Sequence, residues 1–490
     1  MATPIPKNQA QFTLAEVASA SGGELRGSDA LALCGVTTDS RAVVPGELYV
    51  ALRGERFDGH AFVQRALQAG AGALLVSEPD SVPPGLPCVV VRDTLHALGE
   101  LAAHHRARWG GRVLAITGSA GKTTTKELAF AALRAAGAKV ARSAGNLNNL
   151  VGAPLSLLAL DASSDLMVLE IGTSASGEIA RLSAIARPEV GIVTAVAVAH
   201  AEGLGSLEQV AEEKAALLRA LPESGTAIYR SGDPLIAAQL PGVRAHQRLA
   251  FGSDDAADVR LVRSELLAGP NMMIELAVRA PARSVRAELQ LFGTGPALDA
   301  AAALAAVLAL LGEGALDAAA RGLGEVVPGP GRLSPLSGPA GALVLDDSYN
   351  ANPASMRASI ETALELARLR SGRVVLVLGD MLELGARSRE EHEELGRLAA
   401  QPGVAMLLAC GTQMTAAAER ARETAAAERA RETAESVQPV LSVLHLADPS
   451  AAAELLRPLL GPGDVVLVKG SRSIGMERVV EGLASKEGEP

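Results

Sequence analysis

The stretch VLAITGSAGKTTTKEL, residues 113–128, decides the fold of this chain. It begins with an apolar strand pattern, continues through glycine and small polar residues, and becomes helical from Thr124 onward. A strand, a glycine loop and a helix in this order form a phosphate cradle, because glycine lets backbone N–H groups approach phosphate oxygens and the helix N-terminus carries partial positive charge. Lys122 adds a full positive charge, and the Thr123 hydroxyl can bind a Mg²⁺ ion that bridges the phosphates. The sequence therefore predicts a nucleotide site formed by Gly118, Ser119, Ala120, Gly121, Lys122, Thr123 and Thr124.

The loop departs from the common phosphate-loop pattern at one position. That pattern places a glycine five residues before Gly121, where this chain has Ile116. The strand before the loop and the helix after it still favour phosphate binding, because they supply the backbone donors and the helix N-terminus on which such a site depends.

The composition argues against a membrane or nucleic-acid partner. The chain has 490 residues, a length that corresponds to about three domains. Of these residues, 48% are hydrophobic and 20% are charged. Its net charge of −10 disfavours binding to nucleic acid or anionic lipid. The first eleven residues contain no apolar h-region, so we expect no secretion signal, and the apolar run 300–312 is expected to be too short to span a bilayer. Because Cys34, Cys88 and Cys410 are far apart, we expect free thiols and a cytoplasmic protein.

Two glycine-rich positions divide the chain into three units. The first unit, residues 1–109, runs into Gly110-Gly111. The run Pro-Gly-Pro-Gly at 328–331 separates the second unit, residues 110–328, from the third, residues 329–490. We predict an α/β fold of three domains: a smaller N-terminal α/β domain, a central parallel sheet of the P-loop ATPase type, and a C-terminal domain.

In the C-terminal unit, strand and helix patterns alternate regularly. This alternation predicts βαβ units and a doubly wound, Rossmann-like sheet, whose ligands bind outside the carboxyl ends of the strands. We expect strands at 342–345, 373–378, 405–409 and 465–468, and helices at 355–370 and 388–400.

Two strand ends carry candidate metal ligands. The apolar pattern 165–171 ends at Glu170, and a second apolar strand, predicted over 190–199, ends at His200. A carboxylate or an imidazole beside a phosphate loop is suited to hold Mg²⁺. The residues alone leave an alternative open for each: Glu170 can simply cap a turn, and His200 can be an ordinary hydrogen-bonded surface residue.

Lys214 occupies an apolar stripe of the helix predicted over 206–221. Leu207, Val210, Leu217 and Leu221 form the rest of that stripe. A lysine in this place either extends its ammonium to solvent or loses its proton, because burial disfavours the charged form. A neutral amine reacts with CO₂ to give a carbamate, which is an oxygen ligand for a metal ion. The spacing leaves both outcomes open.

A nine-residue repeat lies near the C-terminus. TAAAERARE at 415–423 recurs unchanged at 424–432. Nine residues advance a helix by about two and a half turns, so the second copy presents the opposite face. We therefore expect a duplication on an exposed helix, without a catalytic role.

Together these segments resemble the Mur ligase family, the ATP-dependent amide-bond synthetases of peptidoglycan assembly. The resemblance covers nearly the whole chain. Its motifs are TDSR at 38–41, PGELYVAL at 45–52, DGH at 58–60, TGSAGKTTTKE at 117–127, GNLNNLVGAPLSLL at 145–158, EIG at 170–172, AHAEGLGS at 199–206, PGRL at 330–333, DDSYNANP at 346–353, LGDMLELG at 378–385 and KGSR at 469–472.

The resemblance implies roles for single residues. Lys122 and the loop amides would hold the ATP phosphates, while Thr123 and Glu170 would bind one Mg²⁺ ion. His200 and a carbamylated Lys214 would bind a second ion, and Arg332 would reach the γ-phosphate region. The same resemblance places the nucleotide against Asp347, Tyr349 and Asn350, and the UDP-linked substrate against Ser40, Arg41, Asn148 and Asn149.

Within the family, DDSYNANP and KGSR are typical of the member that adds D-alanyl-D-alanine to UDP-N-acetylmuramoyl-tripeptide. The resemblance thus implies these two small-molecule substrates and a monomeric enzyme. The alternatives are a family ligase with another amino acid, or a nucleotide-dependent binding protein without ligase chemistry.

The chain departs from the family in two places. A His-Asn…Asn pattern that helps to hold the adenine is replaced by Leu298, Asp299 and Ala302. An Asn-His pair is replaced by Ser174-Ala175. Adenine recognition is therefore expected to fall to Asn350 and backbone groups.

Overall fold

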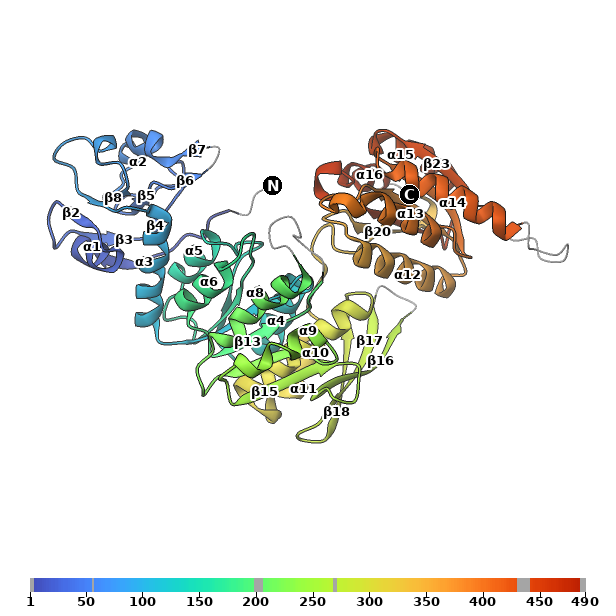
Figure 1. Cartoon of the computed structure of the whole chain (residues 1–490), viewed down its shortest axis with the longest axis horizontal. Coiled ribbons are helices and arrows are strands. Elements are labelled where there is room, and N and C mark those ends of the chain that lie inside the picture. The colour runs from blue at the N-terminus through green and yellow to red at the C-terminus, as the bar shows by residue number, and fades with distance from the viewer. Residues whose placement is uncertain (1–3, 55–56, 198–205, 268–270, 430–440, 485–490) are drawn as a thin grey trace.

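The computed structural model describes residues 4–54, 57–197, 206–267, 271–429 and 441–484, which form three sheets of five or more strands and two two-stranded sheets, with their helices. Three α/β bodies follow one another along the longest axis, in chain order from the blue to the red end of the ribbon (Figure 1). This arrangement confirms the predicted α/β fold class.

The N-terminal body is built on a five-stranded sheet and the helices α1 (Leu14–Ser21) and α2 (Val63–Gln68). Its strands lie in the order β2 (Glu24–Arg26), β9 (Cys88–Val90), β8 (Ala73–Val76), β5 (Leu48–Val50) and β4 (Val36–Thr37). The helix α3 (Thr94–Trp109) leads out of this body and packs against helices of the next one. It begins at Asp93, whose carboxylate accepts hydrogen bonds from two backbone N–H groups, and ends at Gly110, whose φ of 74° stops the helix.

The central body contains a nine-stranded sheet. Its order is β11 (Val140–Arg142), β12 (Leu166–Glu170), β10 (Arg112–Thr117), β13 (Val190–Val193), β14 (Thr226–Arg230), β15 (Gln247–Gly252), β16 (Val259–Leu266), β17 (Met272–Val278) and β18 (Arg283–Leu289). The strands from β11 to β16 are parallel, whereas β17 and β18 are antiparallel to their neighbours. Sequence reasoning did not predict this antiparallel extension.

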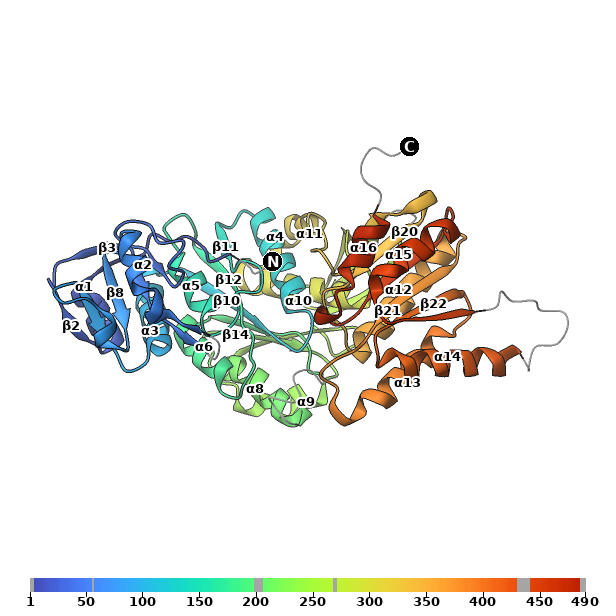
Figure 2. The ribbon, with the colours of Figure 1, turned by 90° about the horizontal axis from the view of Figure 1, so that it is seen from above.

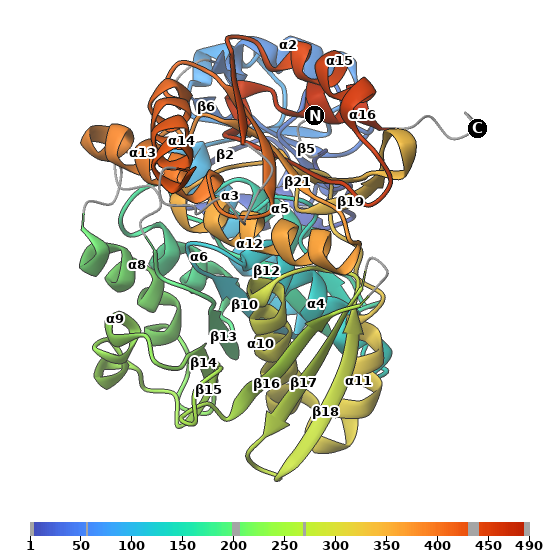
Figure 3. The same ribbon diagram turned by 90° about the vertical axis from the view of Figure 1, so that its right-hand side faces the viewer.

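Helices cover both faces of the central sheet (Figure 3). One face packs against α4 (Lys122–Ala135), α10 (Thr294–Leu311) and α11 (Leu316–Leu323). The other packs against α5 (Gly152–Leu158), α6 (Glu178–Ala186) and α8 (Leu207–Arg219). Because β10, β12 and β13 are parallel and adjacent, their carboxyl ends meet at one edge of the sheet, where the candidate site lies.

The strand predicted over 190–199 is wrong in length. Strand β13 ends at Val193, and residues 194–197 hydrogen-bond to the phosphate loop instead of continuing the sheet. His200, at the predicted end of that strand, lies outside the described residues.

The apolar run 300–312 belongs to a longer helix than its composition suggested. Helix α10 has 18 residues and is apolar enough to cross a membrane by length and composition. It is instead a core helix, because Ala300 to Val307 are all buried between the sheet, α4 and α11. Among the described residues no other helix passes that test.

The C-terminal body is doubly wound, as predicted (Figure 2). Its strands lie in the order β19 (Ser334–Ser337), β20 (Leu343–Asp347), β24 (Val465–Lys469), β21 (Val374–Gly379), β22 (Val404–Cys410) and β23 (Ser442–Leu446). All neighbours except β19 and β20 are parallel. Helices α12 (Pro353–Leu369), α13 (Ser388–Ala399) and α14 (Met414–Arg429) cover one face, and α15 (Ala452–Leu456) and α16 (Glu477–Leu483) the other.

The described part of the nine-residue repeat, residues 415–429, lies on α14, and its two copies differ in environment. In the first copy Ala417, Ala418 and Ala421 are buried against the core, which corrects the prediction of an exposed repeat. In the second copy the equivalent Ala426 and Ala427 are exposed, and this end of α14 extends beyond the body (Figures 1 and 2). These alanines are exposed because the second copy presents the opposite face of the helix, as predicted, and no sheet lies beside that face.

Deleting one copy of the repeat should leave the fold intact. Because the copies are identical, removal of either one gives the same chain, which retains the buried alanines of the first copy. We expect the free energy of unfolding, measured by urea denaturation, to change by less than about 0.5 kcal/mol. A loss of several kcal/mol would show that the second copy is part of the core.

Candidate active site

The phosphate loop lies between the carboxyl end of β10 and the N-terminus of α4. Two of its glycines are required by space: a Cβ on Gly118 would lie 2.0 Å from the Thr194 hydroxyl, and a Cβ on Gly121 would lie 2.4 Å from a carboxylate oxygen of Asp299. Gly121 also has a φ of 81°, which favours glycine. Helix α4 begins at Lys122 rather than at Thr124, so Lys122 and Thr123 lie in its first turn, where backbone N–H groups are free to bind an anion.

Residues 194–197 hold the phosphate loop from one side. The backbone N–H of Ser119 donates to the carbonyl of Ala195 at 2.8 Å, and the N–H of Ala197 donates to the Ser119 hydroxyl at 3.1 Å. Thr194 donates to the carbonyl of Ala120. The chain that leads from β13 toward residue 200 is therefore fixed against the loop.

Lys122 is folded over its own loop. Its Nζ donates to the carbonyl of Gly118 at 2.7 Å. Burial lowers the pKa of the Lys122 ammonium; the carboxylate of Glu170 opposes this shift, and the guanidinium of Arg332 adds to it. Lys122 is thus within electrostatic range both of Glu170 on β12 and of Arg332 from the C-terminal body.

Glu170 has an unused ligand atom. Its side chain is 2% exposed, and Oε1 accepts a hydrogen bond from the amide of Asn148 at 2.8 Å. Oε2 is buried, lies 3.6 Å from Nζ of Lys126 and accepts no hydrogen bond among the described residues. A buried carboxylate oxygen without a hydrogen bond is costly, and oxygen is the ligand that Mg²⁺ prefers. Glu170 at the edge of the phosphate loop therefore fits a metal ligand better than a turn cap.

Lys126 is a site residue that sequence reasoning missed. It is 0% exposed, and its Nζ donates to the carbonyl of Gly145 at 2.8 Å while facing Glu170. Lys126 thereby ties α4 to β12 and to the GNLNNL segment. A signal was present in the sequence, because Lys126 shares the buried stripe of α4 with Thr125 and Ala129, as Lys214 does on its own helix.

Lys214 is buried on α8, and its ammonium does not extend to solvent. The residue is 2% exposed, which rules out the solvent-reaching alternative. Burial, reinforced by the charge of Lys122 and opposed by Glu213 and Glu178, lowers the pKa of Lys214 to about 7. A substantial fraction of the amine is therefore neutral at physiological pH, and this is the form that reacts with CO₂.

The predicted nucleotide residues of the C-terminal body cluster where β20 ends. Asp347 forms an ion pair of 2.6 Å with Lys469 and accepts a hydrogen bond from Ser359. The guanidinium of Arg332 lies 4.4 Å from the centre of the Tyr349 ring. Asn350 is exposed, and its carbonyl accepts a hydrogen bond from Lys469. Asp347 and Lys469 neutralise each other, whereas Arg332 has no carboxylate partner among the described residues.

The predicted substrate residues fall in two places. Asn148 binds Glu170, and Asn149 accepts hydrogen bonds from the N–H groups of Val151 and Gly152 at the start of α5. Ser40 and Arg41 lie in the N-terminal body, where Ser40 is buried and Arg41 forms a 2.7 Å ion pair with Asp39.

The three positions that depart from the adenine pattern lie on α10. Ala302 is fully buried and Leu298 is 6% exposed, so both belong to the core. Asp299 is different, because its carboxylate accepts a hydrogen bond from the Thr125 hydroxyl at 3.0 Å and touches Gly121. Asp299 therefore contacts the phosphate loop.

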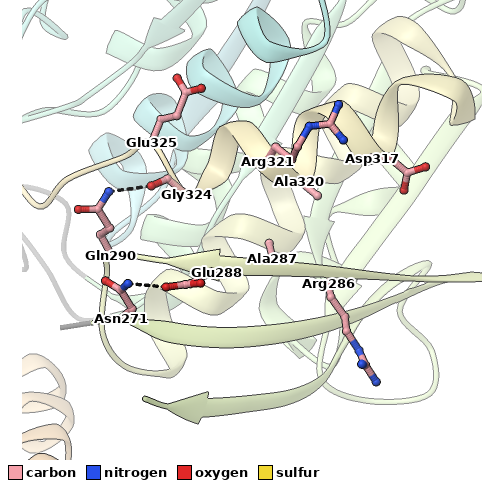
Figure 4. A pocket seen from close by; sticks show the side chains of 10 residues that line it. All are labelled: Asn271, Arg286, Ala287, Glu288, Gln290, Asp317, Ala320, Arg321, Gly324 and Glu325. Carbon is pink, nitrogen blue, oxygen red and sulfur yellow. Dashed lines mark hydrogen bonds between the residues drawn. The ribbon is translucent and has the colours of Figure 1, made fainter. Parts of the chain in front are cut away.

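A concavity of about 770 Å³ lies away from this site, between β18 and α11 (Figure 4). Its polar side chains mostly bind one another or their surroundings: Asn271 donates to Glu288, Gln290 to the carbonyl of Gly324, and Glu325 pairs with Arg134. None of the predicted site residues lines it.

A phosphate loop, a buried carboxylate with a free oxygen, and a lysine whose amine is partly neutral define a nucleotide-using α/β enzyme whose site receives residues from two sheets. Three family models match the chain: the Mur ligase family catalytic domain over residues 33–106, the Mur ligase middle domain over 116–307, and the Mur ligase glutamate ligase domain over 331–472. The chain belongs to the Mur ligase family, which confirms the resemblance seen in its motifs.

Relatives match over nearly the full length. The UDP-N-acetylmuramoyl-tripeptide–D-alanyl-D-alanine ligase of Escherichia coli (strain K12) is 39% identical over 475 residues, covering 96% of this chain and 98% of that protein. The ligase of the same name from Bacillus subtilis (strain 168) is 33% identical and covers 92% and 93%.

Solved structures agree with the fold. A crystal structure of MurF from Acinetobacter baumannii has a TM-score of 0.83 and 30% identity, covering 98% of this chain and 99% of that one. The MurF ligase from Thermotoga maritima in complex with ADP has a TM-score of 0.78 and 29% identity, covering 91% and 96%.

Replacing Lys126 should expose the charge of Glu170. In Lys126→Met the buried carboxylate loses its cation, and we expect the free energy of unfolding to fall by roughly 3–5 kcal/mol. In the double variant Lys126→Met/Glu170→Gln the loss should shrink by at least about half, because both charges of the pair are then removed together. Urea denaturation of the wild type, Lys126→Met, Glu170→Gln and the double variant gives a double-mutant cycle. If the losses of the two single variants add up to the loss of the double variant, the pairing of Lys126 with Glu170 is contradicted.

Proposed function

We propose that the protein joins D-alanyl-D-alanine to UDP-N-acetylmuramoyl-tripeptide in an ATP-dependent reaction and gives the UDP-N-acetylmuramoyl-pentapeptide of peptidoglycan synthesis. The observation that carries this proposal is the 39% identity over 96% of the chain to a ligase of that name. The phosphate loop and the site around Glu170 and Lys214 support it, because a plain binding protein needs neither a free buried carboxylate oxygen nor a partly neutral buried lysine.

The central and C-terminal bodies would divide the work of holding ATP. Lys122, the N–H groups at the start of α4 and the loop residues 118–124 would bind its phosphates. Arg332, which is close enough to Lys122 to lower its pKa, would neutralise charge at the γ-phosphate. Tyr349, beneath Arg332, offers an aromatic face to the nucleotide, with Asp347 and Asn350 beside it.

Thr123 and Glu170 would hold one Mg²⁺ ion, and His200 and the carbamate of Lys214 a second. Magnesium ions would neutralise charge on the transferring phosphoryl group. The carbamate forms when the neutral Lys214 amine attacks CO₂ and releases one proton to solvent. The side chain of Lys214 changes from neutral to anionic in this step, and the resulting negative charge is attracted by Lys122, which repels the protonated form.

The reaction itself needs an activated carboxyl group. A carboxylate oxygen of the tripeptide attacks the γ-phosphorus of ATP, ADP leaves, and an acyl phosphate forms. The amine of D-alanyl-D-alanine then attacks the carbonyl carbon, and the tetrahedral intermediate loses phosphate and a proton to give the amide. Lys122 and Arg332 stabilise the charge that develops on the transferring phosphoryl group, since both are fixed before the reaction. Closure of the C-terminal body over the loop would keep water from the acyl phosphate.

We further propose that the domains span residues 1–109, 110–328 and 329–490. The first would bind the UDP part of the substrate near Ser40 and Arg41, with Asn148 and Asn149 on the second contacting the same substrate. The protein would act as a cytoplasmic monomer on small-molecule substrates.

The proposal is tested by measuring phosphate release with ATP, Mg²⁺, UDP-N-acetylmuramoyl-tripeptide and D-alanyl-D-alanine, leaving out each component in turn. We expect release only with all four, and a product heavier than the tripeptide substrate by D-alanyl-D-alanine minus water. Release without D-alanyl-D-alanine would point to another amine or to a nucleotidase, and no release would favour the binding protein.

Lys214→Met should separate activity from stability. The pKa of Lys214 is lower in the folded protein, about 7, than its ordinary value of 10.5, so the unfolded chain binds more protons between these pH values and stability rises with pH across that window. In CO₂-free buffer we expect the variant to be more stable than the wild type by roughly 3–4 kcal/mol at pH 7, with a smaller difference at pH 10. Its ligase activity should fall at least about 100-fold.

Bicarbonate provides the matching control. Wild-type protein dialysed free of CO₂ should lose activity and regain it on addition of bicarbonate, whereas Lys214→Met should not respond. A wild type that is indifferent to bicarbonate would argue against the carbamate.

A further inference from the structure

We infer that Asp299 is a positioning residue of the phosphate loop that takes up one proton when a nucleoside polyphosphate binds. The inference rests on the proposed function only in requiring that this loop binds nucleotide phosphates.

The position of Asp299 beneath the loop carries the inference. Its carboxylate touches Gly121, the residue that precedes α4, so closely that a Cβ there would lie 2.4 Å from Oδ1. The same oxygen accepts a hydrogen bond from Thr125, one turn into α4. Asp299 therefore supports both the turn at Gly121 and the first turn of α4, the two places whose N–H groups face a bound phosphate.

Few groups around Asp299 stabilise the negative charge of its ionised carboxylate. The residue is 8% exposed. Helix α4 presents Gly121 and the hydroxyl of Thr125 to it, and Arg230 at the end of β14 is the one charged group that favours its ionised form among the described residues. Helix α10 belongs to a hydrophobic core to which α11, β13, β15 and β16 also contribute. Burial accordingly raises the pKa of Asp299 to about 7, against the opposing effects of Thr125 and Arg230.

Bound nucleotide phosphates would favour the protonated form of Asp299 further. An ionised carboxylate under Gly121 repels an anion in the loop, whereas a protonated carboxyl does not. Nucleotide binding is therefore linked to protonation: above pH 7, where the free protein has lost the proton, binding takes one proton from solvent to the carboxylate. Affinity then falls by up to about tenfold for each pH unit over that range.

The test compares ADP binding by calorimetry at several pH values between 7.5 and 9. For the wild type we expect the Kd to rise several-fold across the series, and buffers of different ionisation enthalpy to reveal proton uptake at pH 8. Asp299→Asn keeps the shape and the acceptor oxygen without the charge, so its pH dependence and proton uptake should be much smaller. The comparison removes the contribution of Lys122, which is present in both proteins. Asp255→Asn is the matched control, because Asp255 is an exposed aspartate of the same body, and it should behave as the wild type.

Equal pH dependence in the wild type and Asp299→Asn, or no proton uptake by the wild type, would overturn the inference. If Asp299→Asn does not fold, the proton uptake of the Thr125→Val variant tests the inference instead. Loss of the Thr125 hydroxyl removes a group that favours the ionised form, so at pH 8 more of Asp299 is already protonated and proton uptake should decrease.

A second measurement needs no nucleotide. Because the folded pKa of Asp299 lies above its ordinary value of 3.8, the folded protein binds more protons than the unfolded chain between pH 4 and 7, and this contribution to stability is lost as the pH rises through that window. The Tm of Asp299→Asn should therefore exceed that of the wild type at pH 8 and approach it near pH 4. This result distinguishes a failure of the inference from a failure of the proposed function.

Discussion

Burial of positive charge beside the phosphate loop is the constraint on which the site depends. Lys122 and Lys126 both face the buried carboxylate of Glu170, whose Oε1 accepts a hydrogen bond from Asn148, whereas the charge of Lys214 is opposed by Glu213 and Glu178. Charges of one sign in a water-poor site raise the free energy of the folded protein. Phosphates on the loop and a carbamate on Lys214 would supply the missing negative charge, so the features that make the free site costly also prepare it to bind ATP.

The same constraint explains why the site draws on two sheets. The central body positions the phosphate loop, Glu170 and Lys214. Its lysines would bind the phosphates of ATP but would not reach the other side of the γ-phosphoryl group. In the proposed reaction Arg332 would supply positive charge from the other side of the γ-phosphoryl group; its guanidinium lies over the Tyr349 ring, and the N–H of the next residue, Leu333, donates to Asp347. Closure of the body that carries Arg332 over the loop is part of the proposed function, because it would keep water from the acyl phosphate.

Much of this fold could be predicted from the sequence, because it depends on local patterns. The glycine loop after β10, the alternation in the C-terminal body and the apolar stripe around Lys214 each follow from spacing along one element. The errors arose where contacts between distant segments decide the structure. Strand β13 ends early because residues 194–197 bind the phosphate loop, Ala417 and Ala421 are buried because α13 and the C-terminal sheet lie beside α14, and the contact of Asp299 with Gly121 joins segments almost 180 residues apart. Lys126 was visible in its stripe, but its partners Gly145 and Glu170 were not.

The central claim is that ATP activates a carboxyl group of the substrate at the loop around Lys122. It is tested most directly by labelling the reacting carboxylate of UDP-N-acetylmuramoyl-tripeptide with ¹⁸O and measuring the mass of the phosphate released during turnover with D-alanyl-D-alanine. An acyl phosphate intermediate predicts that one labelled oxygen passes to phosphate for each amide bond formed. Phosphate free of label would contradict the account, because ATP would then have been hydrolysed without activating the substrate.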